Sequence, residues 1–103
     1  MKYKTSKLQK LEKSRTNSII TKNLNNCFIC GRPKDDIHEI FGGANRQRSM
    51  IYGLYIPLCR WCHSRIHNNS DLMDMLHRKA QLEFEKNHTR DEFIQIIGKN
   101  YLM

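Results

Sequence analysis

The four cysteines of this chain form two pairs, and their spacing constrains the fold more than any other feature of the sequence. Cys27 and Cys30 form one C-x-x-C pair, Cys59 and Cys62 form the other, and 28 residues separate the two pairs. Each pair can aim two thiolates at one ion, so that four sulfurs complete a tetrahedral site. Such a metal site adds stability to the modest hydrophobic core of a 103-residue chain. We therefore predict a structural Zn²⁺ bound by these cysteines.

Disulfides, buried free thiols or a redox pair are the alternative uses of four cysteines. The N-terminal sequence "MKYKTSKLQKLEKSRTNS" contains no apolar segment of the kind that a secretory signal needs. No other stretch of the chain approaches the length that spans a membrane. We therefore expect a cytoplasmic protein without membrane contact, and in that compartment thiols stay reduced and favour a metal.

Positive charge is concentrated in the first 24 residues. They contain seven Lys or Arg and one acid, whereas residues 25–103 contain eleven and nine, so the first segment carries six of the eight net positive charges. Basic arms bind phosphate backbones by releasing counterions and need no base contacts. We predict a basic N-terminal arm over 1–24 that binds DNA through Lys7, Lys10, Lys13 and Arg15. A solvated tail is the alternative.

Residues 25–103 are predicted to form one α+β domain with C-terminal helices. Thr89 and Glu92 make a capping box for the last helix, which Gly98 ends, while His77 and His88 are expected at the surface. Before this last helix, we expect a helix over 5–15, a turn at 27–31, strands over 35–41 and 54–58, and a helical turn within 45–53. Two further helices are expected to begin at Arg60 and at Ser70. The helix from Ser70 carries apolar residues at core spacing, namely Leu72, Met75, Leu76 and Ala80.

His63 directly follows the second cysteine pair, and this position separates it from the zinc. If residues 60–67 form a helix, neighbouring side chains lie about 100° apart around its axis, so His63 faces away from the ion that Cys62 binds. His67 lies four residues later on the same face as His63. The two strands are the elements best able to pack there, and the first strand carries His38. We therefore expect His38 and His63 to meet.

The motifs around these histidines resemble those of the HNH endonucleases, the ββα-metal or His-Me finger class. Small phage-type members contain H-x-x-F-G-G-x-N-R and P-L-C-x-x-C-H, which stand here as "HEIFGGANR" at 38–46 and "PLCRWCH" at 57–63. The resemblance covers about residues 27–67 and leaves out the arm and the C-terminal third. It implies a zinc-stapled ββα-metal finger with flanking helices, found in a bacterial or phage-infected cell.

The resemblance further implies a metal-dependent endonuclease that hydrolyses phosphodiester bonds in DNA. His38 would be the general base, a task that suits an imidazole because its ordinary pKa lies near neutrality. His63 would bind the catalytic divalent cation, which would be Mg²⁺, Mn²⁺ or Ni²⁺. Asn45 would be the middle residue of HNH and brace the loop that aims His38, and Arg46 or Arg48 would bind a phosphate.

One position departs from the family pattern and leaves alternatives open. Ile37 precedes His38, where many relatives carry a metal-binding Asp or His. Asp36, on the same face of the strand as His38, either is a ligand of the catalytic cation or orients the His38 imidazole, and His67 is a further candidate ligand. A second register places His38 on the cation and makes Glu39 the base. Two other classes of protein also fit: a catalytically silent zinc-finger DNA-binding module, and a zinc-stapled adaptor that binds a protein. A protein partner that delivers the DNA is a further expectation.

Overall fold

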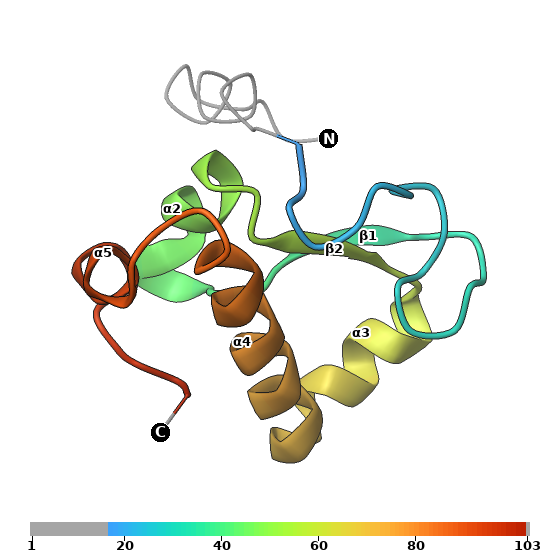
Figure 1. The fold of residues 1–103 in the computed structure, drawn as a ribbon. Helices are drawn as coiled ribbons and strands as arrows, with labels where there is room; N and C mark the ends of the chain where they lie inside the picture. The colour runs from blue at the N-terminus through green and yellow to red at the C-terminus, as the bar shows by residue number, and fades with distance from the viewer. Residues whose placement is uncertain (1–16, 103) are drawn as a thin grey trace, which may run out of the picture.

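The computed structural model describes residues 17–102 of the chain. The predicted helix over 5–15 and the predicted DNA-binding residues Lys7, Lys10, Lys13 and Arg15 lie outside the described residues. Within residues 17–102, a two-stranded antiparallel sheet is joined to four α-helices (Figure 1), which confirms the α+β class. The elements in chain order are β1 (Asp36–Glu39), the 3-10 turn η1 (Gly43–Asn45), α2 (Arg46–Ile51), β2 (Tyr55–Leu58), α3 (Arg60–His67), α4 (Ser70–Phe84) and α5 (Arg90–Ile97).

The sheet places His38 beside the buried centre of the second strand. β1 pairs with β2 so that His38 lies opposite Ile56 and Ile37 lies opposite Pro57. All four residues of β2 are buried, in keeping with its continuous apolar sequence. The strand expected over 35–41 is shorter in the structure, where β1 covers Asp36–Glu39. Beyond its end, the Ile40 N–H still donates to the Leu54 carbonyl at 3.0 Å. The sheet therefore holds the His38 backbone between two paired strands.

Residues 17–28 cover the outer edge of β2. The Ser18 hydroxyl donates to the Tyr55 carbonyl at 2.7 Å, and the Phe28 N–H donates to the Pro57 carbonyl at 2.8 Å. The Ile19 N–H donates to the Gly53 carbonyl at 2.9 Å. Gly53 has a φ of +73°, and a Cβ there would collide with the Asn17 carbonyl, so glycine is needed at this crossing. The covered edge removes a row of unpaired backbone groups from solvent.

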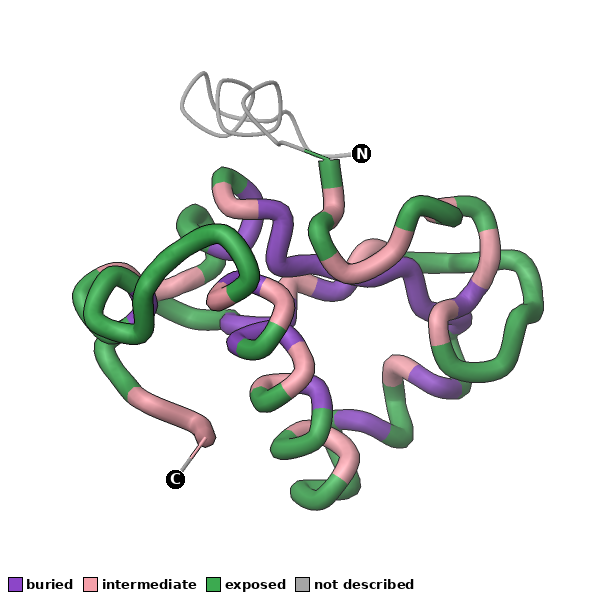
Figure 2. Tube along the Cα trace, viewed as in Figure 1, coloured by how far each residue is buried: buried purple, intermediate pink, exposed green. Residues whose placement is uncertain are grey.

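Helices α3 and α4 pack below the sheet in Figure 1, and the N-terminal segment approaches it from above. α5 lies beyond the far end of α4 (Figure 1). Buried positions follow β2 and the inner faces of α3 and α4 (Figure 2). The core cluster includes Ile56, Ile66, Ala80, Phe84 and Phe93. Because the interior of a small domain is close-packed, this core fixes α3 against β1.

The helix boundaries follow the sequence signals closely, with two differences in α4. α5 has the predicted Thr89–Glu92 capping box, and Gly98 ends it with a φ of +94°. α4 begins at Ser70 as expected, but the side chain of Asn69 is its cap. The prediction that Met75 lies in the core is wrong, because 54% of its surface is exposed. The inner face of α4 turns toward Leu76 and Ala80 instead.

Candidate metal centres

The four cysteines converge at one end of the molecule, where the turn over 27–31 meets the start of α3. Their four Sγ atoms all lie within 4.8 Å of one another, and the Cys30 and Cys59 sulfurs are 3.6 Å apart. Four thiolates bound to one zinc at about 2.3 Å stand about 3.8 Å apart. All four cysteines are free, and Cys27, Cys59 and Cys62 are buried. The cluster can hold a structural metal ion such as zinc.

Local backbone chemistry explains why the two cysteine pairs meet. The Gly31 N–H donates to the Cys27 carbonyl at 2.9 Å, and Gly31 has a φ of +81°, so the turn doubles back. At the start of α3, the Cys59 sulfur accepts the Cys62 N–H at 3.4 Å. The Asp35 carboxylate accepts the Arg60 N–H at 2.7 Å. Two acceptors thus cap α3 and hold Cys62 in the cluster.

Proton equilibria within the thiol cluster also suit a cation. Burial raises the pKa of the Cys27 thiol, but backbone hydrogen bonds from Cys59, Cys30 and Ile29 outweigh it and lower that pKa to about 6. Burial, together with hydrogen bonds to the other cysteines, raises the pKa of Cys62 to about 12. The Cys27 thiol therefore ionises more readily than the Cys62 thiol, and a bound cation would displace the remaining thiol protons.

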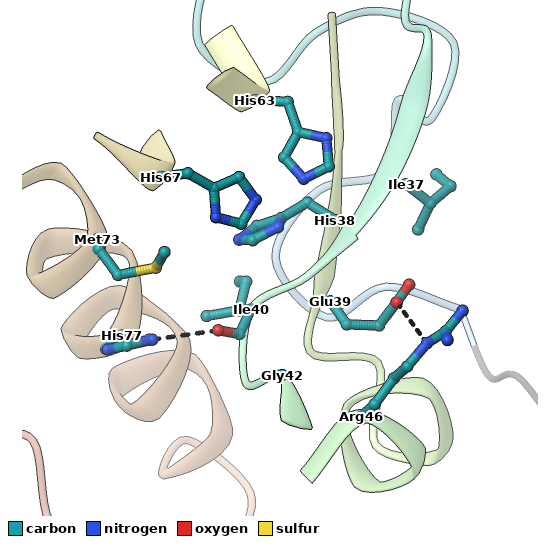
Figure 3. Close-up of a pocket in the computed structure, with 10 residues that line it drawn as sticks. All are labelled: Ile37, His38, Glu39, Ile40, Gly42, Arg46, His63, His67, Met73 and His77. Atoms are coloured by element: carbon teal, nitrogen blue, oxygen red, sulfur yellow. Dashed lines mark hydrogen bonds and ion pairs between the residues drawn. The ribbon is translucent and has the colours of Figure 1, made fainter. Parts of the chain in front are cut away.

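A second cluster consists of three imidazoles, one from β1 and two from α3. The ligand atoms of His38, His63 and His67 lie within 4.8 Å of one another. The ring centroids of His38 and His63 are 5.1 Å apart, and those of His38 and His67 are 6.0 Å apart. Figure 3 shows the three rings turned toward one another above the strand. The expected meeting of His38 and His63 is thus observed, and His67 joins them.

His38 is the buried member of the imidazole cluster. Only 6% of its surface is exposed, and its Nε2 is buried with no hydrogen-bond partner among the described residues. Burial first, and then the charges of His63, His67 and His77, lower its pKa to about 4. His38 is therefore a neutral imidazole at neutral pH. An unpartnered buried nitrogen costs free energy unless a ligand satisfies it, and a neutral imidazole is the form that binds metals.

Asp36 lies beside His63, although the sequence suggested a role next to His38. Its Oδ2 is 3.3 Å from the Nδ1 of His63. Because a carboxylate only accepts, this hydrogen bond requires a proton on Nδ1, so in the neutral ring Nε2 of His63 keeps its lone pair. Carboxylates orient metal-binding histidines in this way. Asp36 lies outside the group of three imidazoles whose ligand atoms converge, so the geometry favours an orienting role.

The imidazoles open into a pocket of about 380 Å³ that Glu39 and Arg46 also line. The Nε of Arg46 donates to Oε1 of Glu39 at 3.1 Å. In Figure 3 both side chains lie on the side of β1 away from His67, and Ile37 points away from the three rings. Arg46 thus brings a cation to the pocket, whereas Ile37 contributes no ligand atom.

The remaining predicted site residues are held near the pocket without lining it. The Nδ2 of Asn45 donates to the carbonyl of Ile97 at 2.9 Å, which ties the loop after β1 to the last residue of α5. Arg48 donates to the Ala44 carbonyl at 3.2 Å and to Oδ1 of Asn45 at 3.4 Å. Neither residue is among those that line the pocket. Asn45 therefore ties this loop to α5 from a position outside the cavity.

His77 is the pocket residue that sequence reasoning missed. Expected at the surface, it is half-buried on α4 and lines the pocket. Its Nε2 is 3.1 Å from the carbonyl of Ile40, and its ring stacks on Phe41 with centroids 5.0 Å apart. Burial lowers the pKa of His77. Its contacts come from Ile40 and Phe41, just after β1, and from Tyr101 near the C-terminus, so no local pattern in the sequence marks it.

Comparisons with protein-family models, with curated proteins and with solved structures found no match to this chain. None of the helices in residues 17–102 is long and apolar enough to cross a membrane. The function must therefore be argued from the two side-chain clusters and the pocket.

Proposed function

We propose that this protein is a metal-dependent endonuclease of the HNH, ββα-metal kind, which hydrolyses phosphodiester bonds in DNA. The observation that carries the proposal is the convergence of His38, His63 and His67 at one pocket, separate from the four thiols. Thiolates suit a closed structural zinc site, whereas imidazoles beside an open pocket suit a cation that also contacts substrate. The order of strand, strand and helix around this centre is the order that the resemblance implies.

In this mechanism the polar residues at and beside the pocket divide the tasks. His63 and His67, on one face of α3, would hold the catalytic Mg²⁺, Mn²⁺ or Ni²⁺, and Asp36 would orient His63. When bound, such a cation neutralises charge that develops on the scissile phosphate and the leaving oxygen. Arg46 would bind a phosphate oxygen at the pocket rim through its guanidinium.

The role of His38 distinguishes two versions of the mechanism. In the first, His38 is the general base that takes a proton from the attacking water. In the second register, His38 is the third ligand and Glu39 takes the proton. A base works best with a pKa near the working pH, and the pKa of His38 is about 4. Its Nε2 is buried without a partner among the described residues, and one of its ring nitrogens lies within the ligand group. These properties favour His38 as the third ligand. The Glu39 carboxylate lines the same pocket from the side of β1 away from His67, so in this version it would act on a water at that end of the pocket.

Two substitutions separate these versions. If His38 is a ligand, His38→Ala should weaken cation binding and abolish cleavage. Glu39→Gln should then leave cation binding intact and lower cleavage by roughly 10² to 10⁴, the contribution of a general base. If His38 is the base, His38→Ala should keep the cation and lose cleavage. Calorimetric cation titration and plasmid nicking measure the two effects.

Controls for the pocket variants are available on α4 and after it. Glu83→Gln removes a carboxylate that pairs with Lys86 at 3.0 Å, much as Glu39 pairs with Arg46. His88→Ala removes a histidine outside the pocket. Both should cleave like wild type. DNA binding without cleavage in Mg²⁺, Mn²⁺ and Ni²⁺ would refute the nuclease proposal and leave a silent zinc-finger DNA-binding module.

A further inference from the structure

Trp61 is the most exposed large apolar side chain in residues 17–102, with 59% of its surface accessible. It lies on α3, four residues before Arg65 and two before His63. At 100° per residue, Trp61 and Arg65 share one face of α3, while His63 and His67 lie on another. The pocket chemistry therefore leaves this tryptophan unused, although its exposure costs free energy.

Two guanidinium groups from different elements contact the Trp61 ring. The Cζ of Arg65 lies 5.2 Å from the ring centroid, and the Cζ of Arg32, from the segment after the cysteine turn, lies 5.8 Å away. Both distances fall within the range of cation–π contacts. We define this set, Arg32, Trp61 and Arg65, as the Trp61 patch.

The surroundings of the Trp61 patch are positively charged. Residues 27–34 and α3 together contain four Lys or Arg and no Asp or Glu. Asp35, which follows in the same loop, accepts the Arg60 N–H at 2.7 Å, so the nearby acid serves the helix start. An exposed aromatic ring among arginines offers a stacking face together with phosphate contacts, which is the combination that single-stranded nucleic acids need.

We propose that the Trp61 patch binds unpaired nucleotides of the DNA, with one base stacked on the indole and adjacent phosphates on Arg32 and Arg65. In a duplex each base face is already covered by its neighbours, so an indole on the surface can stack only on a base that has lost a neighbour. A base that stacks on the indole displaces one guanidinium from the ring. The displaced guanidinium then lies within reach of the phosphate of that same nucleotide. The choice of DNA as the partner rests on the proposed nuclease function.

The single tryptophan of the chain makes this proposal directly measurable. Zinc-loaded protein is titrated with a 12-nucleotide oligo(dT) and with a duplex of equal length, without added Mg²⁺, Mn²⁺ or Ni²⁺. Stacking should quench the fluorescence of Trp61 with oligo(dT) and far less with the duplex. Trp61→Ala should weaken oligo(dT) binding at least roughly 5-fold, the lower bound for loss of one stacked base, when binding is followed by anisotropy of labelled DNA. Its affinity for the duplex should change less than about twofold, because no stacked base is lost there.

Matched variants separate stacking from charge. Trp61→Phe keeps an aromatic face and should retain most of the affinity for oligo(dT). Arg32→Gln and Arg65→Gln should each lower the slope of log K against log salt by about 0.7, the value for one phosphate contact on a single strand. Arg78→Gln, which removes an exposed guanidinium from α4, should leave that slope unchanged.

Unchanged oligo(dT) binding by Trp61→Ala would overturn the inference and leave the patch as a contact for a protein. An equal loss on oligo(dT) and duplex would also overturn it, because stacking on unpaired bases predicts selectivity. These titrations do not depend on cleavage. A protein that binds through the patch but never cuts DNA would refute only the nuclease proposal, and a nuclease whose Trp61→Ala variant binds normally would refute only this inference.

Discussion

Asp36 provides the sharpest test of the proposal that the imidazole cluster binds a cation. In the structure its Oδ2 lies 3.3 Å from Nδ1 of His63, and the two side chains are 47% and 26% exposed. If Asp36 orients His63, Asp36→Asn should keep the ring in place but hold it less firmly. The carboxylate lies outside the converging ligand atoms, so the variant should still bind a cation.

The magnitude follows from the geometry of this contact. Loss of a residue that orients a metal ligand costs about 10- to 100-fold in metal affinity. The Asp36–His63 distance exceeds the roughly 2.7–2.9 Å of a strong charge-assisted hydrogen bond, and solvent reaches both partners. We therefore expect the lower end, a loss of about 10-fold in Ni²⁺ affinity, measured by calorimetry on zinc-loaded protein.

Asp74→Asn is the matched control for this substitution. Asp74 is 50% exposed and pairs with Arg78 at 3.1 Å on α4, so its loss changes the net charge equally at another surface. Ni²⁺ affinity should not change in this variant. An equal effect of the two substitutions would refute the orienting role, and a loss above about 10³-fold for Asp36→Asn would show direct coordination by Asp36, the role first suggested by the sequence.

Three further predictions concern the scaffold. The purified protein should contain one zinc per chain, measured by atomic absorption. Because the metal supplies folding free energy, chelation should unfold the protein, as followed by circular dichroism. A metal-free protein of equal stability would contradict this prediction. Phe93→Ala should cost about 3–5 kcal/mol in urea unfolding, because Phe93 is fully buried between Phe41 and Phe84. Leu82→Ala, at a 54% exposed position, should stay within about 0.5 kcal/mol. Thr89→Ala should cost about 1 kcal/mol in the same assay through loss of the capping box, and an unchanged midpoint would show that α5 does not need its cap.

Features with a local cause could be predicted from the sequence. The C-x-x-C spacing predicted two pairs of sulfurs that can share an ion, and the four thiols do converge. The helix period placed His63 and His67 on one face, and both face His38. The cap residues Thr89 and Gly98 marked the ends of α5 within one residue. Each of these signals depends on backbone geometry over five residues or fewer, which short patterns encode.

Features with a distant cause could not be predicted in the same way. Gln81 is fully buried because its side chain meets Asn100 and the backbone of Tyr101, some 20 residues away. His77 is held by Ile40, 37 residues away. Met75 fits the apolar stripe of α4 but lies outside the inner face, since no described element packs over it. Sequence periodicity indicates that a helix is amphipathic, but the contacts on each side depend on the tertiary fold.

The eight residues of α3 contribute to both candidate metal centres and to the Trp61 patch, which limits how this part of the chain can evolve. One inserted residue after Cys62 would rotate every later side chain by about 100° around the helix axis. His63 and His67 would leave the pocket together, and Arg65 would leave the face of Trp61. Insertions and deletions should therefore be rare in α3 among natural variants, whereas exposed polar positions such as Ser64 should vary freely. The segment is expected to be inherited as one block of fixed length.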